Sequence, residues 1–210
     1  HYLGETQHHK LQHITSIERL LEADFVWMDK FTIRNLELYH SNNHSAVTLI
    51  DVIDKTLSPM GGRLLKRWLA LPLKSVEAIK GRHDVVGYFY ENEAVLLDLQ
   101  SHLKGMGDLE RLISKVATAK VNPREVVQLK NTLEQLLPIK ALALASSQTA
   151  LNNIGKEIVE CEALRSKIKA TLNEDAPVNV LKGNTIASSA NEALASLRDV
   201  AYSGKDYLDQ

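Results

Sequence analysis

The clearest structural signal in the chain lies at residues 54–73, DKTLSPMGGRLLKRWLALPL. Ser58 has the side chain of a good N-cap residue, and Pro59 suits the first helical position, where its missing N–H is no loss. Pro72 lacks the N–H that a continuing helix would need, so the helix is predicted to end there. Between these limits the apolar residues form one broad face at helical spacing: Leu64, Leu65, Trp68, Leu69 and Leu71. The segment therefore predicts an amphipathic helix, with Trp68 in the core.

The chain continues with the same pattern of a capping residue followed by an apolar run. Ser75 is predicted to cap a second helix, and a third begins at about Ala94 and is broken by Gly105 and Gly107. Asp108 is predicted to cap the next helix, DLERLISKVATA. Together these signals predict a mainly α fold with a multi-helical core.

The longest run of helix-forming residues follows Asn122-Pro123. Pro138 is predicted to end this helix or to kink it. Residues 139–172 are predicted to be further helix, with an apolar stripe: Ile158, Cys161, Leu164, Ile168 and Leu172. Residues 173–184 form the longest irregular connection.

The last segment has a heptad stripe that is rich in small residues: Ala187, Ala190, Leu194, Leu197, Ala201, Gly204 and Leu208. Such a stripe suits close packing against another long helix. We therefore expect a long helix at this end, packed against an apolar partner.

The beginning of the chain differs in composition. Residues 2–12 are predicted to be a short helical segment. Residues 14–38 carry Ile, Val, Phe, Trp and Thr around a polar centre, which predicts a small N-terminal β-hairpin. A polar loop at 39–45 and a short helix at 46–54 are predicted to follow.

Composition and charge restrict the function. The chain has 210 residues, 44% of them apolar, and a formal net charge of −1, so no bulk basic field favours nucleic acid. The single cysteine excludes an internal disulfide and indicates a reducing, cytoplasmic location. No apolar run approaches the roughly 18 residues that a membrane span needs. Because the sequence starts at His1 without Met and stops within a predicted helix, we expect it to be part of a longer protein.

No constellation of residues predicts a catalytic, cofactor or metal site. Glu5, His9 and His13 share a helical spacing, but scattered histidines produce such pairs by chance, and no cysteine supports them. Asp108 and Glu110 are interpreted as a helix cap and a salt-bridge partner rather than as an acid/base pair. Cys161, on an apolar stripe, is expected to be a buried, inert thiol. No G-x-x-x-x-G-K-[ST] phosphate loop is present in the 210 residues.

The strongest basic feature is the cluster of Arg63, Lys66 and Arg67. Two interpretations remain open for it. It is either a solvated helix face or a contact surface for a neighbouring domain of the parent protein.

Several short motifs, in order along the chain, resemble those of the MutS family of DNA mismatch-repair proteins. Residues 54–73 are similar to the family's core signature, and Arg82 with Val85 resembles the Arg and Val that follow it. The other similar segments are MDKFTIRNLEL (28–38), GDLERLISKV (107–116) and NPREVVQL (122–129). In SSANEALASLRDV (188–200), Asn191 and Arg198 match the family's lever-helix pattern, whereas Ser189 and Ser196 depart from it.

The resemblance implies the core and lever region that links a DNA clamp to an ATPase. Residues 1–13 would end a connector region, 14–185 would form the helical core, and 186–210 would start a lever helix toward a clamp that lies outside the chain. The segment itself would not be an enzyme. The parent would use ATP and Mg²⁺, would bind mismatched duplex DNA, a second MutS subunit and the repair protein MutL, and would be cytoplasmic and nucleoid-associated when on DNA.

An alternative is a self-contained helical interaction scaffold that shares only short motifs with the family. The parent sequence beyond Gln210 distinguishes the two, because the MutS interpretation requires a clamp insert and then a phosphate-binding loop there.

Overall fold

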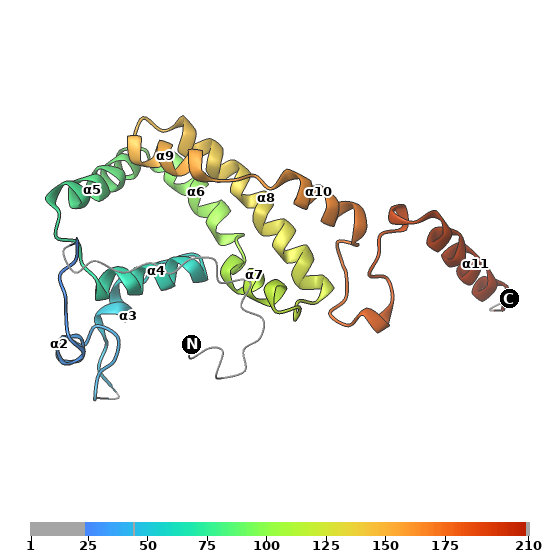
Figure 1. Ribbon diagram of the computed structural model, residues 1–210, viewed down its shortest axis with the longest axis horizontal. Coiled ribbons are helices and arrows are strands. Elements are labelled where there is room, and N and C mark those ends of the chain that lie inside the picture. The colour runs from blue at the N-terminus through green and yellow to red at the C-terminus, as the bar shows by residue number, and fades with distance from the viewer. Residues whose placement is uncertain (1–23, 44, 209–210) are drawn as a thin grey trace, which may run out of the picture.

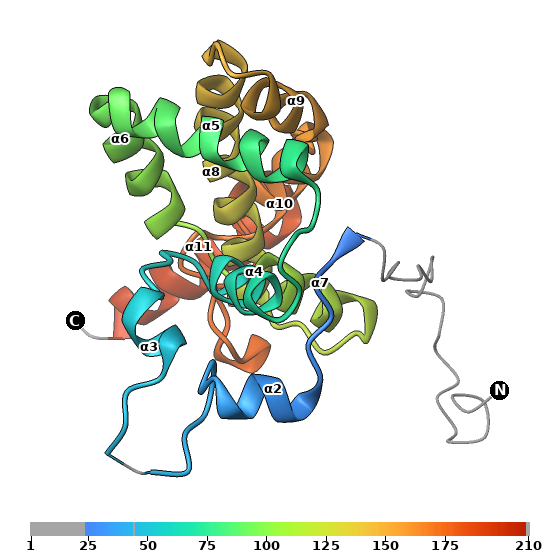
Figure 2. The same ribbon diagram turned by 90° about the vertical axis from the view of Figure 1, so that its left-hand side faces the viewer.

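The computed structural model describes residues 24–43 and 45–208, with side chains described up to Ala201. This part of the chain is mainly helical, as predicted, and forms an open arc of helices (Figures 1 and 2). Its α-helices are α2 (Lys30–Asn35), α3 (Leu49–Ile53), α4 (Pro59–Ala70), α5 (Val76–Glu91), α6 (Glu93–Lys104), α7 (Leu109–Ala117), α8 (Pro123–Ala145), α9 (Thr149–Glu157), α10 (Glu162–Thr171) and α11 (Glu192–Leu208). None of the helices described is long and apolar enough to cross a membrane.

The predicted helix starts are confirmed, because the expected side chains cap them. The Ser58 hydroxyl accepts a hydrogen bond from the Gly61 N–H at 3.2 Å, and Pro59 occupies the first turn of α4. Ser75 and Asp108 cap α5 and α7 in the same way. Each cap satisfies an N–H that the helix leaves without an internal partner.

The 23-residue helix α8 is the centre of the arc. In Figure 1, α6 lies along one side of it and α9 and α10 along the other. A small core of Leu112, Leu129 and Leu133 joins α7 to α8. Cys161 packs against this core but is half-buried, not fully buried as predicted.

Helix α8 does not end at Pro138 but continues to Ala145. The proline removes one helical hydrogen bond. The segment beyond it is held by α9, whose buried Gly155 lies directly against Ala143 and Leu144. Tertiary packing therefore outweighs the local preference.

The predicted β-hairpin is wrong for residues 24–38, and residues 14–23 lie outside the described part of the chain. Within 24–38 there is no hairpin strand, only an isolated antiparallel bridge from Phe25 to Leu73. The segment after it is the helix α2, because the Asp29 side chain accepts from the Thr32 N–H at 2.7 Å and caps it. Phe25 therefore pairs with a distant residue instead of a neighbouring strand.

The predicted helical stripe over 158–172 is also interrupted. Residues 158–161 separate α9 from α10, and Cys161 adopts a left-handed conformation with φ 48° at the start of α10. The stripe residue Ile168 is buried, but Leu164 is 45% exposed. Two short helices thus replace the longer one expected.

The irregular connection is a closed loop. An isolated antiparallel bridge joins Leu172 to Ile186, and the Asn173 side chain donates to the Asn184 and Ile186 carbonyls. Inside the loop, residues Val180–Lys182 form a short 3-10 turn. The loop brings the end of α10 close to the residues that precede α11.

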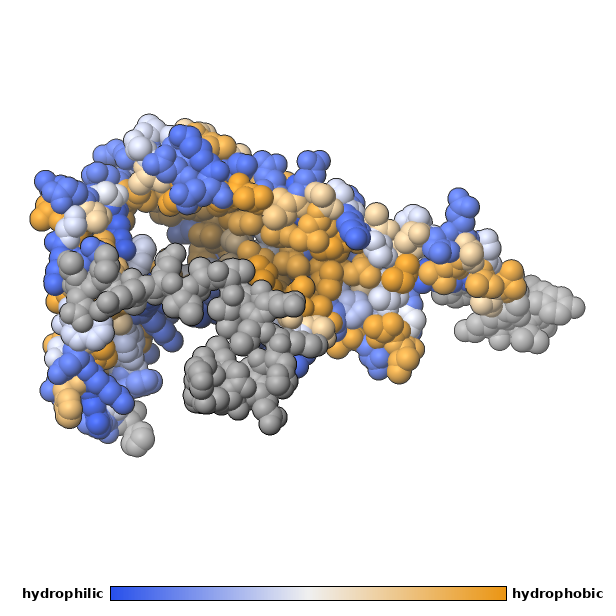
Figure 3. Space-filling view, viewed as in Figure 1, coloured by the Kyte–Doolittle hydropathy of each residue, from blue (hydrophilic) through white to orange (hydrophobic). Residues whose placement is uncertain are grey.

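Helix α11 begins at Glu192, so the first two stripe residues, Ala187 and Ala190, precede it. It extends away from the rest of the arc (Figure 1) and packs mainly against the short 3-10 turn at Ser188–Ala190. Leu197 and Val200 are each 68% exposed. In the part of this helix whose side chains are described, up to Ala201, apolar side chains are therefore open to solvent, as Figure 3 also shows.

Candidate functional site

The guanidinium of Arg63, in the middle of α4, forms a fork with two carboxylates at the start of α7. Its two terminal nitrogens donate to the Asp108 carboxylate at 2.8 and 2.7 Å, and Nε donates to the Glu110 carboxylate at 2.8 Å. A planar guanidinium suits such paired contacts, which are among the stronger hydrogen bonds in proteins. This fork joins two segments that are 45 residues apart in the sequence.

The start of α7 explains why the two acids lie where they do. Asp108 is the N-cap, and its Oδ1 also accepts from the Arg111 N–H at 3.1 Å. Glu110 is in the first turn, where the helix dipole favours negative charge. The predicted roles of cap and salt-bridge partner are confirmed for both residues, and the partner is Arg63.

The fork is partly shielded from water. The Asp108 side chain is 19% exposed, against 48% for Arg63. The hydrogen bond from Arg63 lowers the pKa of Asp108 from 3.8 to about 2, and the two carboxylates raise the pKa of Arg63. Asp108 is therefore charged at neutral pH, and α4 is held to α7 and, through α7, to the core on α8.

Lys66 and Arg67 are placed differently from Arg63. Both side chains are exposed, and neither forms an ion pair within residues 24–43 and 45–208. The Lys66 carbonyl accepts a hydrogen bond from the Tyr39 hydroxyl, which fastens the loop before α3 to α4. The predicted inter-domain role of these two cations stays a prediction, while Arg63 is used inside the chain.

Trp68 is not a core residue, which corrects the sequence-based prediction. It is 42% exposed, and the guanidinium of Arg82 lies 3.6 Å from the centre of its ring. Such a cation–π contact stabilises a ring that stays in contact with water. It also connects α4 to α5, because Arg82 belongs to α5.

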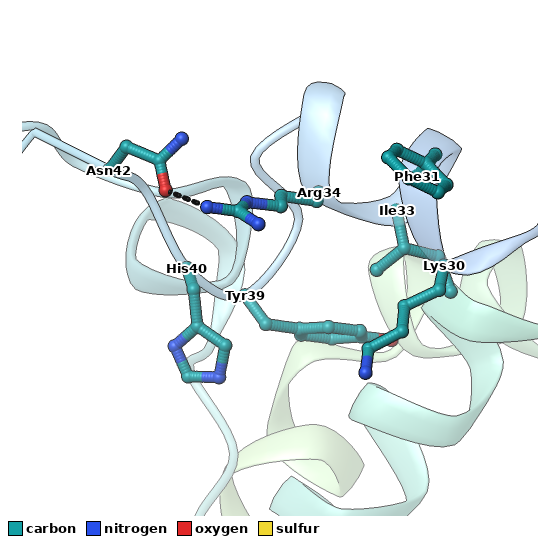
Figure 4. Close-up of a pocket in the computed structure, with 7 residues that line it drawn as sticks. All are labelled: Lys30, Phe31, Ile33, Arg34, Tyr39, His40 and Asn42. Atoms are coloured by element: carbon teal, nitrogen blue, oxygen red, sulfur yellow. Dashed lines mark hydrogen bonds between the residues drawn. The ribbon is translucent and has the colours of Figure 1, made fainter.

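A pocket of about 660 Å³ lies beside α2. Figure 4 shows the residues that line it: Lys30, Phe31, Ile33, Arg34, Tyr39, His40 and Asn42. This pocket was not predicted from the sequence. The available signal was the four-residue spacing of Lys30 and Arg34, which places two cations on one helical face next to Phe31.

Metal and catalytic chemistry find no support in the described residues. No three His, Cys, Asp or Glu side chains in this part of the chain lie close enough together to hold a metal ion. Glu5, His9 and His13 lie outside the described residues. The arrangement around α4 is one of contacts between elements, not of reacting groups.

The chain is similar to known proteins along its whole length. A family profile described as MutS domain III matches residues 31–205. The DNA mismatch repair protein MutS of Flavobacterium johnsoniae is 60% identical over 209 residues, which cover 100% of this chain and 24% of that protein. The corresponding proteins of Flavobacterium psychrophilum and Parabacteroides distasonis are 57% and 48% identical, over 100% and 99% of the chain and 24% of their own length. The chain thus spans about a quarter of the length of these relatives.

Proposed function

Since the profile covers most of the chain, the chain belongs to the MutS domain III family, and we propose that it is the core and lever segment of a mismatch-repair protein. In this role it transmits changes of position between a DNA-binding clamp and an ATPase. Both would lie in the three-quarters of the parent protein that this chain does not cover. The segment itself would contribute no catalytic group.

The Arg63 fork is the observation that supports a transmitting role. It joins α4 to α7 through three hydrogen bonds, and α7 shares an apolar core with α8. A force applied at α4 therefore reaches α8 through charged contacts that have a defined geometry. From α8 the chain continues through α9, α10 and the closed loop to the projecting α11.

The names of the relatives give DNA mismatch repair alone, and the cofactors and partners of the parent are proposals that rest on the resemblance of its motifs to the MutS family. We infer ATP and Mg²⁺ as its cofactors, and mismatched duplex DNA, a second subunit and MutL as its partners. A cytoplasmic protein that associates with the nucleoid on DNA fits this role. The self-contained scaffold gains no support from relatives that match the whole chain at up to 60% identity and are about four times longer.

The test is the Arg63→Gln variant of the full-length protein. We expect basal ATP hydrolysis to persist, because no ATPase residue is altered, while the change in ATP hydrolysis on adding mismatched DNA becomes smaller. Lys120→Gln, at an exposed lysine between α7 and α8, is the matched control and should leave this response unchanged.

Two results would contradict the proposal. One is an Arg63→Gln protein whose response to mismatched DNA equals that of the unaltered protein. The other is an equal loss of response in the Lys120→Gln control, which would show that the assay reports net charge and not the fork.

A further inference from the structure

Helix α2 is short, and the rest of the described chain buries none of its residues. It has six residues, none of them buried, and Phe31 is 75% exposed. Isolated helices of fewer than about 12 residues are marginal in water. The flanking residues Trp27 and Leu36 are 63% and 56% exposed, so the apolar surface extends beyond the helix.

The chain directly after α2 is firmly anchored, in contrast. Leu38 is buried at 6% exposure, and its carbonyl accepts from the Ile50 N–H of α3 at 3.1 Å. The Tyr39 hydroxyl donates to the Lys66 carbonyl of α4. The pocket beside α2 therefore has a fixed floor at Tyr39 and a wall, α2, that lacks packing on its outer side.

The pocket is positively charged and contains apolar surface. In Figure 4, Lys30 and His40 lie on either side of the Tyr39 ring, and Arg34 reaches across to Asn42, whose side-chain oxygen accepts from its guanidinium at 2.6 Å. Among the described residues that line the pocket, none is acidic.

The carboxylates near the pocket are engaged elsewhere, including Asp51, which accepts from the Thr48 hydroxyl at 2.6 Å. Asp29 caps α2, and Glu37 accepts from the Ser41 hydroxyl at 2.6 Å. The charges of Lys30 and Arg34 are therefore left for a ligand that brings its own negative charge.

We propose that this pocket docks a segment of the parent protein from outside residues 1–210, one that has an apolar side chain flanked by Asp or Glu. The apolar side chain would lie against Phe31, Ile33 and Tyr39, and the acids would pair with Lys30 and Arg34. This inference rests on the proposed function, because the relatives are about four times longer than this chain and leave a large length of polypeptide to supply the segment.

A nucleic acid fits the pocket less well. Phosphate backbones are bound by rows of Lys and Arg that neutralise several successive charges. Here there are only two permanent cations, Lys30 and Arg34, and one of them is already hydrogen-bonded to Asn42. A phosphate backbone would also offer no apolar group to pack against Phe31 and Ile33.

The experiment replaces Phe31 with a photoreactive phenylalanine analogue in the full-length protein and identifies the cross-linked peptides by mass spectrometry. We expect one dominant cross-link, to a peptide outside residues 1–210 that contains Asp or Glu next to an apolar residue. The same analogue at Tyr90, which is 87% exposed on α5, is the matched control and should not capture that peptide.

The charge requirement is tested in the same protein. Lys30→Glu with Arg34→Glu should lower the yield of this cross-link severalfold, because the captured acids would then face like charges. Lys120→Glu should leave the yield unchanged. Substituting Lys for the captured acids should restore the cross-link to the doubly reversed protein, a result that unfolding of α2 could not give.

Each other result overturns the proposal: a cross-link only to residues 1–23, one to a second copy, one to added DNA, or none. A failure of the docking proposal can be told apart from a failure of the proposed function. A protein that keeps its response to mismatched DNA but gives no such cross-link rejects only the docking. One that gives the cross-link but shows no response rejects only the transmitting role.

Discussion

The Asp108→Asn substitution separates the two roles of this side chain. Asn is as good an N-cap as Asp, so the bond to the Arg111 N–H can be kept. The charge that binds Arg63 is lost. The variant therefore measures the fork alone, whereas Asp108→Ala removes the cap as well and should destabilise by about 1 kcal/mol more.

The size of the effect follows from the pKa of Asp108. A fall from 3.8 to about 2 corresponds to at most about 2.5 kcal/mol of stabilisation at neutral pH. Arg63 is 48% exposed and keeps Glu110 as a partner, so screening and the remaining bond reduce this value. We expect Asp108→Asn to lower the free energy of unfolding by about 1 kcal/mol at pH 7.

The pH dependence has a definite sign. A carboxylate whose pKa is lowered by folding stabilises fully above its unfolded pKa, near 3.8, and this stabilisation is lost as the pH falls toward about 2. The difference in free energy of unfolding between the unaltered protein and Asp108→Asn should therefore be constant from pH 7 to pH 5 and become smaller below pH 4. It should also shrink at about 1 M salt.

Urea unfolding of the 210-residue chain, followed by circular dichroism at several pH values, measures the difference. Equal midpoints at pH 7 would refute the reasoning, because the fork would then contribute nothing. A difference that did not narrow below pH 4 would show that the substitution acts through packing or the cap instead of the charge.

Five further substitutions, at three places in the fold, are tested by the same urea assay. Leu133→Ala, in the apolar core at 6% exposure, should cost about 2–5 kcal/mol, and an unchanged midpoint would remove α8 from the centre of the fold. Gly155→Ala should destabilise by about 1–3 kcal/mol because an added Cβ would lie 3.0 Å from the α8 backbone, whereas Gly87→Ala, with open space around it, should stabilise by about 0.5–1 kcal/mol. Glu174→Ala should lower the unfolding midpoint, because the buried Lys130 then keeps only the Glu134 carboxylate at 3.9 Å and loses its contact at 2.9 Å. Lys130→Met, which leaves no buried charge, should lower the midpoint less, and the reverse order would contradict this account.

The helix boundaries that could be predicted from the sequence are those set by local chemistry. Ser58, Ser75 and Asp108 each lie directly before a helix and bond to an N–H within its first turn. Such contacts span only three residues, so the order of residue types is enough to place them. The central helix, its capping box at Asn122 and the mainly α class follow from the same rules.

The features that could not be predicted depend on residues far apart in the sequence. Phe25 pairs with Leu73 rather than with a neighbouring strand, and the local β-pattern gave no sign of this partner. Trp68 has an apolar ring at a core spacing, yet the guanidinium of Arg82 on α5 lies against this ring. The break at Cys161 interrupts a stripe whose spacing is that of a continuous helix.

The candidate site could be predicted only in part. Arg63, Asp108 and Glu110 could each be singled out as charged residues with a local role, but their pairing spans 45 residues and is visible only in the fold. The pocket at α2 was missed for another reason. Its segment was assigned to a hairpin, in which Lys30 and Arg34 would not share a helical face with Phe31.

The distribution of exposed apolar residues distinguishes this arrangement of helices from a self-sufficient domain. A cluster of buried apolar side chains joins α7 to α8, whereas Phe31, Trp27 and Leu197 at the two ends of the arc are each more than 60% exposed. Leaving large apolar side chains in water forgoes about 1.5–3 kcal/mol each, so a chain that folded only for itself would gain from covering them. Both ends instead carry such residues on helices that are attached to the rest of the described chain on one side only. Helix α2 is attached through the anchored loop that follows it, and α11 through the closed loop that precedes it. That arrangement suits a segment that is stable at its centre and is completed at its ends by other parts of a larger protein.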